Sequence, residues 1–255
     1  MPELPDLQAF SHNLQKRLHG KTLKEIKTHT TKLNVTAAEL KKTVEGKELS
    51  SVRREGKELY LEFEGGAILA LHLMLHGQLY LDDEEHKYSV IELLFDDGLT
   101  LNLTDFQKAA TPTLNPEPKD APDAMDKEVD FTFLKKTLQA KKAVVKNILL
   151  DQHIIRGIGN AYADEILWDA RISPFSISNK IPEAKIKDLA RSIRSVLEHA
   201  EQQILKTHPD IISGEVRDFM SVHSSHKKES PRGAKIHIKT GTRKTYYTDE
   251  QELFD

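Results

Sequence analysis

The first residues of the chain, Met1-Pro2-Glu3, place a potential nucleophile beside an acid. Pro2 is small enough for the initiator methionine to be removed, which would leave a secondary amine at the N-terminus. An α-amine has a pKa of about 8, so a useful fraction is neutral at physiological pH. A neutral amine can attack an electrophilic carbon and form an iminium, which permits a later elimination, while Glu3 transfers protons. Because Met-Pro starts are common, this pair alone does not identify a nucleophile.

A second group of residues, Gly157 to Asn160, could bind an anion. Gly157 and Gly159 let the backbone turn tightly and approach a ligand closely. Asn160 then begins a helix as its expected N-cap, where free backbone N–H groups and the helix dipole attract negative charge. A DNA phosphate is the natural occupant. The same Gly-x-Gly turn could also do no more than pack two helices together.

Residues 149–167 read Leu-Leu-Asp-Gln-His-Ile-Ile-Arg-Gly-Ile-Gly-Asn-Ala-Tyr-Ala-Asp-Glu-Ile-Leu, and Ile172-Ser173-Pro174 follows. This string resembles the helix–two-turn–helix (H2TH) module of the formamidopyrimidine-DNA glycosylase/endonuclease VIII family. The start Pro2-Glu3-Leu4-Pro5-Asp6 resembles the N-terminal signature of the same family, with Asp6 in place of glutamate. The resemblance implies a base-excision-repair DNA glycosylase with AP-lyase activity on oxidised bases in double-stranded damaged DNA. Pro2 would be the nucleophile, Glu3 would transfer protons, and no cofactor would be needed.

Further site residues follow from the same resemblance. Lys57, after Arg53-Arg54-Glu55-Gly56, matches a lysine that contacts the phosphate and lesion, and Lys146 falls where the family has a lysine near the target. Leu75 stands at the wedge position of His72-Leu73-Met74-Leu75-His76-Gly77. The companion loop has Gln107 and Ala109 where the formamidopyrimidine branch has arginine and phenylalanine, which favours oxidised pyrimidines as substrates.

The C-terminal segment 233–248 alternates around Thr240-Gly241 and predicts a β-hairpin. It resembles the family's zinc-finger hairpin, with Arg243 matching the arginine that enters the minor groove. The cysteine positions fall on Thr248 and Gln251 and near Glu229 and Arg232, and the chain has 0 cysteines. We therefore expect a zincless finger without a metal, held by packing on the helical domain through Tyr246 and Tyr247.

The elements that must position these residues follow from hydrophobic periodicity. Leu7, Phe10, Leu14 and Leu18 recur at helical spacing after Pro5. Short segments with a period of two predict a sandwich or barrel; they are 22–28, 48–54, 58–63, 67–73, 78–82, 88–95 and 99–103. The proline-rich stretch 111–122 predicts a linker that is neither helix nor central strand. Helices are expected over 131–139, 142–151, 160–170 and 182–206.

Together with these elements, the resemblance implies an α+β multidomain protein with four parts. An N-terminal catalytic β-sandwich domain covers 1–112 and a linker covers 113–130. A helical H2TH DNA-binding domain covers 131–222, and a zincless β-hairpin finger covers 223–255.

Composition narrows the class of protein without identifying its partner. The net charge of -3 gives phosphates little overall attraction, although Lys and Arg are concentrated after residue 226. No apolar run approaches the roughly 20 residues of a membrane helix, and the acidic, proline-containing start is not a signal peptide. We expect a cytoplasmic monomer, associated with the nucleoid if bacterial.

Two other functions stay open from sequence alone. The departures at Gln107, Ala109 and the cysteine positions would suit a non-catalytic binder of abasic or damaged DNA on the same scaffold. The retained Pro2, Glu3 and Lys57 argue against that reading, because a pure binder would not need all three. An RNA-binding module is a third reading, since a Gly-Ile-Gly turn also occurs in a ribosomal RNA-binding protein, but the Pro-Glu-Leu start argues against it.

Overall fold

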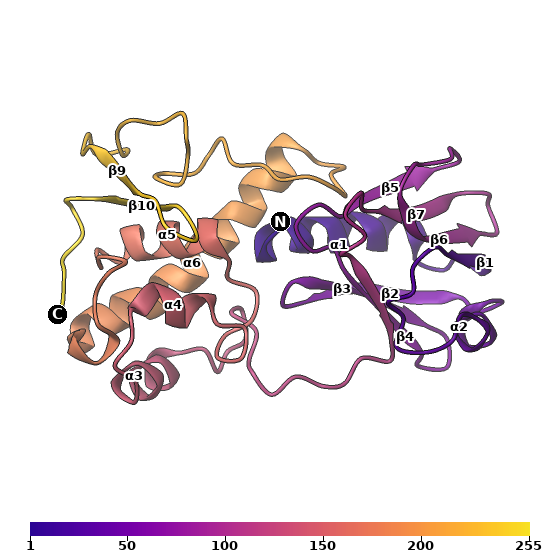
Figure 1. Cartoon of the computed structure of the whole chain (residues 1–255), viewed down its shortest axis with the longest axis horizontal. Coiled ribbons are helices and arrows are strands. Elements are labelled where there is room, and N and C mark those ends of the chain that lie inside the picture. Colours follow the sequence, from indigo (N-terminus) through magenta and orange to yellow (C-terminus); the bar gives the residue numbers. More distant parts are fainter. The chain divides into compact units, whose positions relative to one another are not determined.

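The N-terminal half forms two antiparallel four-stranded sheets, which confirms the predicted β-sandwich (Figure 1). In the computed structural model, which describes residues 1–255, the sheets have the orders β1-β6-β7-β5 and β2-β3-β4-β8. The strands are β1 Leu23–Thr28, β2 Leu49–Glu55, β3 Glu58–Phe63, β4 Ile68–His72, β5 Gln78–Asp82, β6 Ser89–Phe95, β7 Thr100–Thr104 and β8 Thr111–Leu114. Phe63 of one sheet and Phe95 of the other belong to the same buried cluster, so the two sheets share a hydrophobic core.

Helix α1, Leu4–Leu18, is anchored in this core by the periodic residues that predicted it. Leu7, Phe10, Leu14 and Leu18 are at most 1% exposed and join the same cluster as the sheets. Each such side chain contributes about 1.5–3 kcal/mol when it is fully buried. The start of α1, directly after Pro2 and Glu3, is therefore held in a fixed position.

Two elements of the N-terminal half were not predicted. The stretch 111–122 begins with the strand β8, in which Pro112 pairs with Leu71 of β4. Because β8 lies at the edge of its sheet, a proline there need not cost a ladder hydrogen bond, so the linker prediction was wrong for this strand. Helix α2, Ala37–Val44, buries only Leu40 and Val44, which is too few residues for a clear helical period.

The second half of the chain is helical with a terminal hairpin. Its helices are α3 Phe131–Gln139, α4 Val145–Leu150, α5 Asn160–Asp169, the short 3-10 helix η1 Ser178–Lys180 and α6 Glu183–Thr207. Helix α4 is shorter than predicted because Val144 is extended and forms a bridge with Ile177. Strands β9, Ile236–Lys239, and β10, Thr245–Thr248, pair antiparallel as the predicted hairpin.

The chain divides into two compact units. One unit comprises residues 1–118 with 204–215, and the other comprises 119–203 with 216–255. The segment 204–215, which we had expected within the helical domain, is grouped with the sandwich. Asn13 donates to the carbonyl of Ile211 at 2.8 Å, and the backbone N–H of Leu79 donates to the hydroxyl of Ser213 at 2.9 Å. No helix combines the length and the apolar character needed to cross a membrane.

Candidate active site and nucleic-acid interface

Glu3 is fixed at the start of α1 by a reciprocal pair of hydrogen bonds. Its carboxylate accepts from the backbone N–H of Asp6, and the carboxylate of Asp6 accepts from the backbone N–H of Glu3 at 2.9 Å. The pair is a capping box in which Asp6 takes the place of a longer acid. Glu3 is 5% exposed and Asp6 0%. The expected proton-transfer group therefore has a defined position directly beside Pro2.

Pro2 is buried and lines a pocket of about 610 Å³ in the N-terminal unit. Leu75, Phe106 and Glu215 line the same pocket. The amino group of Met1 forms an ion pair with Glu215. While Met1 precedes it, the nitrogen of Pro2 is an amide and has no nucleophilic lone pair. Amine chemistry at Pro2 therefore requires removal of Met1.

The loop between β4 and β5 presents Leu75 at the edge of this pocket. Leu75 is 59% exposed, whereas Leu73 is 1% exposed and belongs to the core. The loop closes tightly because the N–H of Gly77 donates to the carbonyl of Leu73 at 2.9 Å. A Cβ on Gly77 would lie 2.1 Å from that same oxygen, so only glycine fits. The sequence does not tell which of Leu73 and Leu75 is a core residue. In the structure Leu75 is the exposed one.

Phe106, on the companion loop, is a candidate site residue that the sequence analysis missed. Its side chain is 58% exposed, and its ring centroid lies 4.7 Å from that of His76. The buried carboxylate of Asp105 fixes the loop by accepting backbone N–H bonds of 2.7–2.9 Å from Gln107, Ala109 and Ala110. The resemblance to the family loop places the aromatic residue at position 109, where this chain has alanine. The signal in the sequence was a different aromatic residue, Phe106, directly after Asp105.

Lys57 lies on the tight turn between β2 and β3. Gly56 takes a φ of +57°, and the guanidinium of Arg54 donates to its carbonyl at 3.1 Å. Arg54 also donates to the side chain of Gln8 on α1 at 2.9 Å, which ties the turn to the helix that carries Glu3. Lys57 is half-buried and is not among the residues that line the Pro2 pocket.

The Gly-Ile-Gly turn of the second unit is held by Gln152. The side chain of Gln152 accepts from the N–H of Gly157 and donates to the carbonyl of Ile158, both at 2.9 Å. Gly157 adopts a φ of +101°, which favours glycine. The N-cap of α5 is Gly159 rather than Asn160, which corrects our assignment by one residue.

Asn160 instead occupies the first turn of α5 and connects it to the hairpin. Its side-chain amide donates to the carbonyl of Lys244 at 2.9 Å. Its Oδ1 is buried and has no hydrogen-bond partner in the structure. The amide is therefore oriented by the hairpin with an acceptor left over at the start of the helix.

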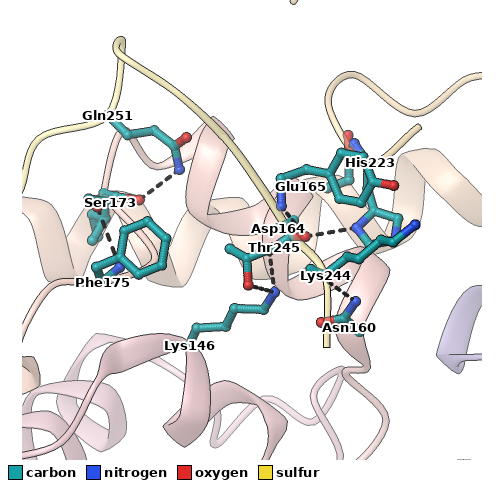
Figure 2. A network of polar contacts seen from close by, with 12 residues as sticks. Lys146, Asn160, Asp164, Glu165, Ser173, Phe175, His223, Lys244, Thr245 and Gln251 are labelled. Atoms are coloured by element: carbon teal, nitrogen blue, oxygen red, sulfur yellow. Dashed lines mark hydrogen bonds and ion pairs between the residues drawn. The ribbon is translucent and has the colours of Figure 1, made fainter. Parts of the chain in front are cut away.

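Lys146 forms a buried ion pair at the centre of a polar network (Figure 2). It is 5% exposed, and its ammonium lies 2.6 Å from Asp164 and donates to the hydroxyl of Thr245 at 2.9 Å. Asp164 also accepts from the backbone N–H of Tyr246 at 3.0 Å and lies 2.8 Å from Nδ1 of His223. These contacts connect α4 and α5 to β10.

Glu165, the next residue, holds the segment before the hairpin. Its carboxylate accepts three backbone N–H bonds of 2.7 Å, from Ser221, Val222 and His223. Burial raises the pKa of Glu165 above its ordinary value, although these three bonds and the nearby His223 oppose the shift. Asp164 and Glu165 belong to the string that resembles the H2TH module, but the sequence did not indicate that they accept from backbone N–H groups 56 to 82 residues further along the chain.

Arg243 is exposed on the connection between β9 and β10. It lines a pocket of about 200 Å³ together with Lys146, Asn160 and Lys239. The exposed side chains of Lys239 and Arg243 and the N-terminal turn of α5 therefore border one depression in the second unit, whereas Asp164 balances the charge of Lys146. This arrangement suits an anion, because both the side chains and the helix dipole favour negative charge.

The hairpin packs on α5 through an apolar cluster. Tyr246 is 5% exposed and belongs to a buried cluster with Trp168, Val222 and Ile236. Tyr247 contacts the ring of Phe175 edge-on, with centroids 5.0 Å apart. Packing therefore holds the hairpin through both tyrosines.

The residues at the family's zinc-binding positions do not fit the metal. Thr248, Gln251 and Arg232 lack the thiolate or imidazole groups that zinc fingers use, and the chain has 0 cysteines. No group of three His, Asp or Glu side chains in the structure is arranged to hold a metal ion.

Comparison with known proteins agrees with this arrangement. The family models described as Formamidopyrimidine-DNA glycosylase N-terminal domain and H2TH domain match residues 1–111 and 121–208. A formamidopyrimidine-DNA glycosylase of Carboxydothermus hydrogenoformans is 32% identical, over 77% of this chain and 76% of that protein. One of Pelotomaculum thermopropionicum is 32% identical over 97% of both chains. The solved structure of MutM in complex with carbocyclic 8-oxo-G containing DNA matches with a TM-score of 0.88 and 25% identity, covering 98% of this chain and 100% of that one.

Proposed function

We propose, from the premise that this chain belongs to the formamidopyrimidine-DNA glycosylase family, that it excises oxidised bases from double-stranded DNA and then cleaves the strand as an AP lyase. The observation that carries the proposal is the position of Pro2. Pro2 lines a pocket whose edge carries exposed apolar side chains. The buried side chain of Glu3 comes directly after Pro2 in the chain. A free secondary amine at this position would meet an extruded nucleotide beside a fixed proton donor and acceptor.

The chemistry uses the Pro2 amine after Met1 is removed. Its neutral nitrogen attacks the sugar C1′ and forms a carbon–nitrogen bond, the glycosidic bond breaks, and the base leaves with a proton. Glu3 protonates the sugar ring oxygen as the ring opens to an iminium. Loss of a C2′ proton then expels the 3′-phosphate, and water hydrolyses the remaining imine to free the enzyme.

Each unit carries residues to which we assign contacts with the DNA backbone. We assign phosphate contacts to Lys57, to Gly159 and Asn160 at the start of α5, and to Arg243 on the hairpin. Lys146 lines the same pocket as Asn160 and Arg243, but Asp164 balances its charge. We therefore assign Lys146 to shaping the pocket rather than to neutralising a phosphate.

The activity is tested with duplexes that carry a single oxidised pyrimidine, a single 8-oxoguanine or no lesion. We expect strand cleavage of the damaged duplexes, fastest with the oxidised pyrimidine, and none of the undamaged one. Faster cleavage at 8-oxoguanine would reverse the proposed base preference only. Tight binding of an abasic duplex without any cleavage would instead support the non-catalytic damage binder.

Phe106 gives the first mutational prediction. We propose that Phe106, whose ring contacts that of His76 at a tilt of 48°, supports Leu75 in filling the space that the extruded base leaves. Because stacking of a base on an aromatic ring contributes about 1–3 kcal/mol, Phe106→Ala should weaken binding to an abasic duplex by about tenfold. Binding is measured by fluorescence anisotropy. Leu253→Ala, which removes another exposed apolar side chain, is the matched control, and equal affinities of all three proteins would contradict this role.

The second mutational prediction concerns Arg243 and the salt dependence of DNA binding. If Arg243 neutralises one phosphate, Arg243→Gln should lower the slope of log affinity against log salt concentration by about one. Arg191→Gln removes the same charge from α6, where Arg191 pairs with Asp188, and should leave the slope unchanged. An unaltered slope for Arg243→Gln would place this arginine outside the phosphate contacts.

A further inference from the structure

The finger hairpin lacks zinc ligands, but one carboxylate lies close to the positions where they would be. Glu250 stands between Thr248 and Gln251, two of the family's cysteine positions. Its carboxylate accepts a hydrogen bond from the hydroxyl of Ser230 at 2.7 Å, and Ser230 lies between the other two positions, Glu229 and Arg232. The carboxylate therefore connects the two short loops that a zinc ion would connect in a four-cysteine finger.

The same carboxylate fastens both loops to the helical unit. The indole N–H of Trp168, on α5, donates to Oε2 of Glu250 at 3.0 Å. The guanidinium of Arg171, just after α5, donates to Oε1 at 2.9 Å. The Glu250 side chain is 14% exposed, so these charge-assisted bonds are largely screened from water.

Each loop is also closed by its own polar side chain. In the first loop, the hydroxyl of Ser230 accepts from the backbone N–H groups of Arg232 and Ala234, both at 3.3 Å. In the second, the side chain of Gln251 accepts from the N–H of Thr248 at 2.8 Å and donates to the carbonyl of Ile172 at 2.9 Å. Neutral hydrogen bonds therefore shape the loops, and Glu250 is the charged group that joins them.

We propose that Glu250 takes over the structural role of the absent metal: its carboxylate joins the two finger loops to Trp168 and Arg171 and so positions the hairpin that carries Arg243. Glu250 is a positioning residue in this account and touches no DNA. The inference does not rest on the proposed enzymatic activity, because it concerns how the hairpin is held. It predicts that the finger is independent of zinc.

The electrostatics around Glu250 support this role. Burial acts to raise its pKa, but the hydrogen bonds from Trp168, Ser230 and Arg171 together hold the pKa below its ordinary value of 4.5. The guanidinium of Arg171 pairs directly with Glu250 at 2.9 Å, and the guanidinium groups of Arg171 and Arg232 each lie 5.8 Å from the ring centroid of Trp168. A lowered pKa means that the stabilisation is complete above the unfolded value and is lost as the pH falls through the folded one.

The test combines amide hydrogen exchange with the fluorescence emission of Trp168, which is the single tryptophan of the chain. Glu250→Gln should speed exchange of the hairpin amides at 236–239 and 245–248 at least about tenfold, while the strands of the sandwich keep their protection. Asp249→Asn is the matched control, because it removes a neighbouring carboxylate that is 84% exposed. A chelator should change nothing in the unmodified protein.

The pH dependence separates a charged link from simple packing. Emission from Trp168 in the unmodified protein and in Asp249→Asn should change on acidification below 4.5, and that change should be absent in Glu250→Gln. If Glu250→Gln does not fold, Ser230→Ala is the second variant. It removes the 2.7 Å bond to Glu250 and the two 3.3 Å bonds that the hydroxyl accepts within its own loop, but it keeps the bonds from Trp168 and Arg171, so it should show a smaller loss of hairpin protection. Unchanged protection in these variants, an equal effect of Asp249→Asn, or loss of protection with chelator would overturn the proposal.

Discussion

A form of the protein whose Pro2 nitrogen is blocked by an uncleaved N-terminal tag should lose AP-lyase activity by on the order of 10³-fold or more. The blocked nitrogen is an amide, and its lone pair is delocalised into the carbonyl, so it cannot attack C1′. The rate is measured as single-turnover cleavage of a duplex with one abasic site. Intact mass establishes which residue begins each preparation.

The controls for this experiment separate chemistry from binding. The same tag placed after Asp255 leaves Pro2 available once Met1 is removed and should leave the rate unchanged. Because Pro2 lines the pocket beside Leu75 and Phe106, a bulky tag could also obstruct DNA. Binding of a duplex with a tetrahydrofuran abasic analogue measures that obstruction directly. A tagged protein that cleaves at the normal rate would remove Pro2 from the mechanism.

Glu3→Gln should lower excision of an oxidised base by about 10²–10⁴-fold, the usual contribution of a positioned proton donor. Cleavage at a preformed abasic site should fall less, because no base has to depart. The glutamine oxygen can still accept from the N–H of Asp6, so the capping box is kept and α1 stays in place. The two rates are compared on matched duplexes.

Asp6→Ala is the control for a purely structural role of Glu3. Asp6 accepts from the backbone N–H of Glu3 at 2.9 Å, and removing this acceptor should cost about 0.5–2 kcal/mol of stability. It should therefore lower the thermal midpoint more than Glu3→Gln does and lower the excision rate less. If Asp6→Ala reduced excision as strongly as Glu3→Gln, the loss would reflect helix positioning instead of proton transfer.

Most of the fold could be predicted because its elements carry strong hydrophobic periods. The strands that share the sandwich core and the helices α3, α5 and α6 follow the predicted ranges within one residue at most boundaries. Helix α2 escaped because it buries only two residues, and β8 escaped because Pro112 tolerates an edge strand. In both cases tertiary position, rather than local pattern, decides the structure.

The candidate site was predictable in its residue types but not in its long-range partners. Pro2 and Glu3 lie at a helix start, Leu75 in the loop between β4 and β5, and Arg243 on the hairpin, and the roles of these residues stay predictions. The burial of Lys146 against Asp164 depends on contacts with Thr245, and no local pattern encodes these contacts. Phe106 was missed because it lies three positions before position 109, where the family has its aromatic residue.

Borohydride trapping of the unmodified protein on an abasic duplex, followed by peptide mapping of the adduct, tests the central claim most directly. Reduction fixes the iminium as a stable amine, so the covalent link marks the nucleophile. We expect a one-to-one protein–DNA adduct on the N-terminal peptide, attached at Pro2, in protein that has lost Met1. An adduct on a lysine such as Lys57, or no adduct from protein that begins at Pro2 and binds the duplex, would contradict this claim.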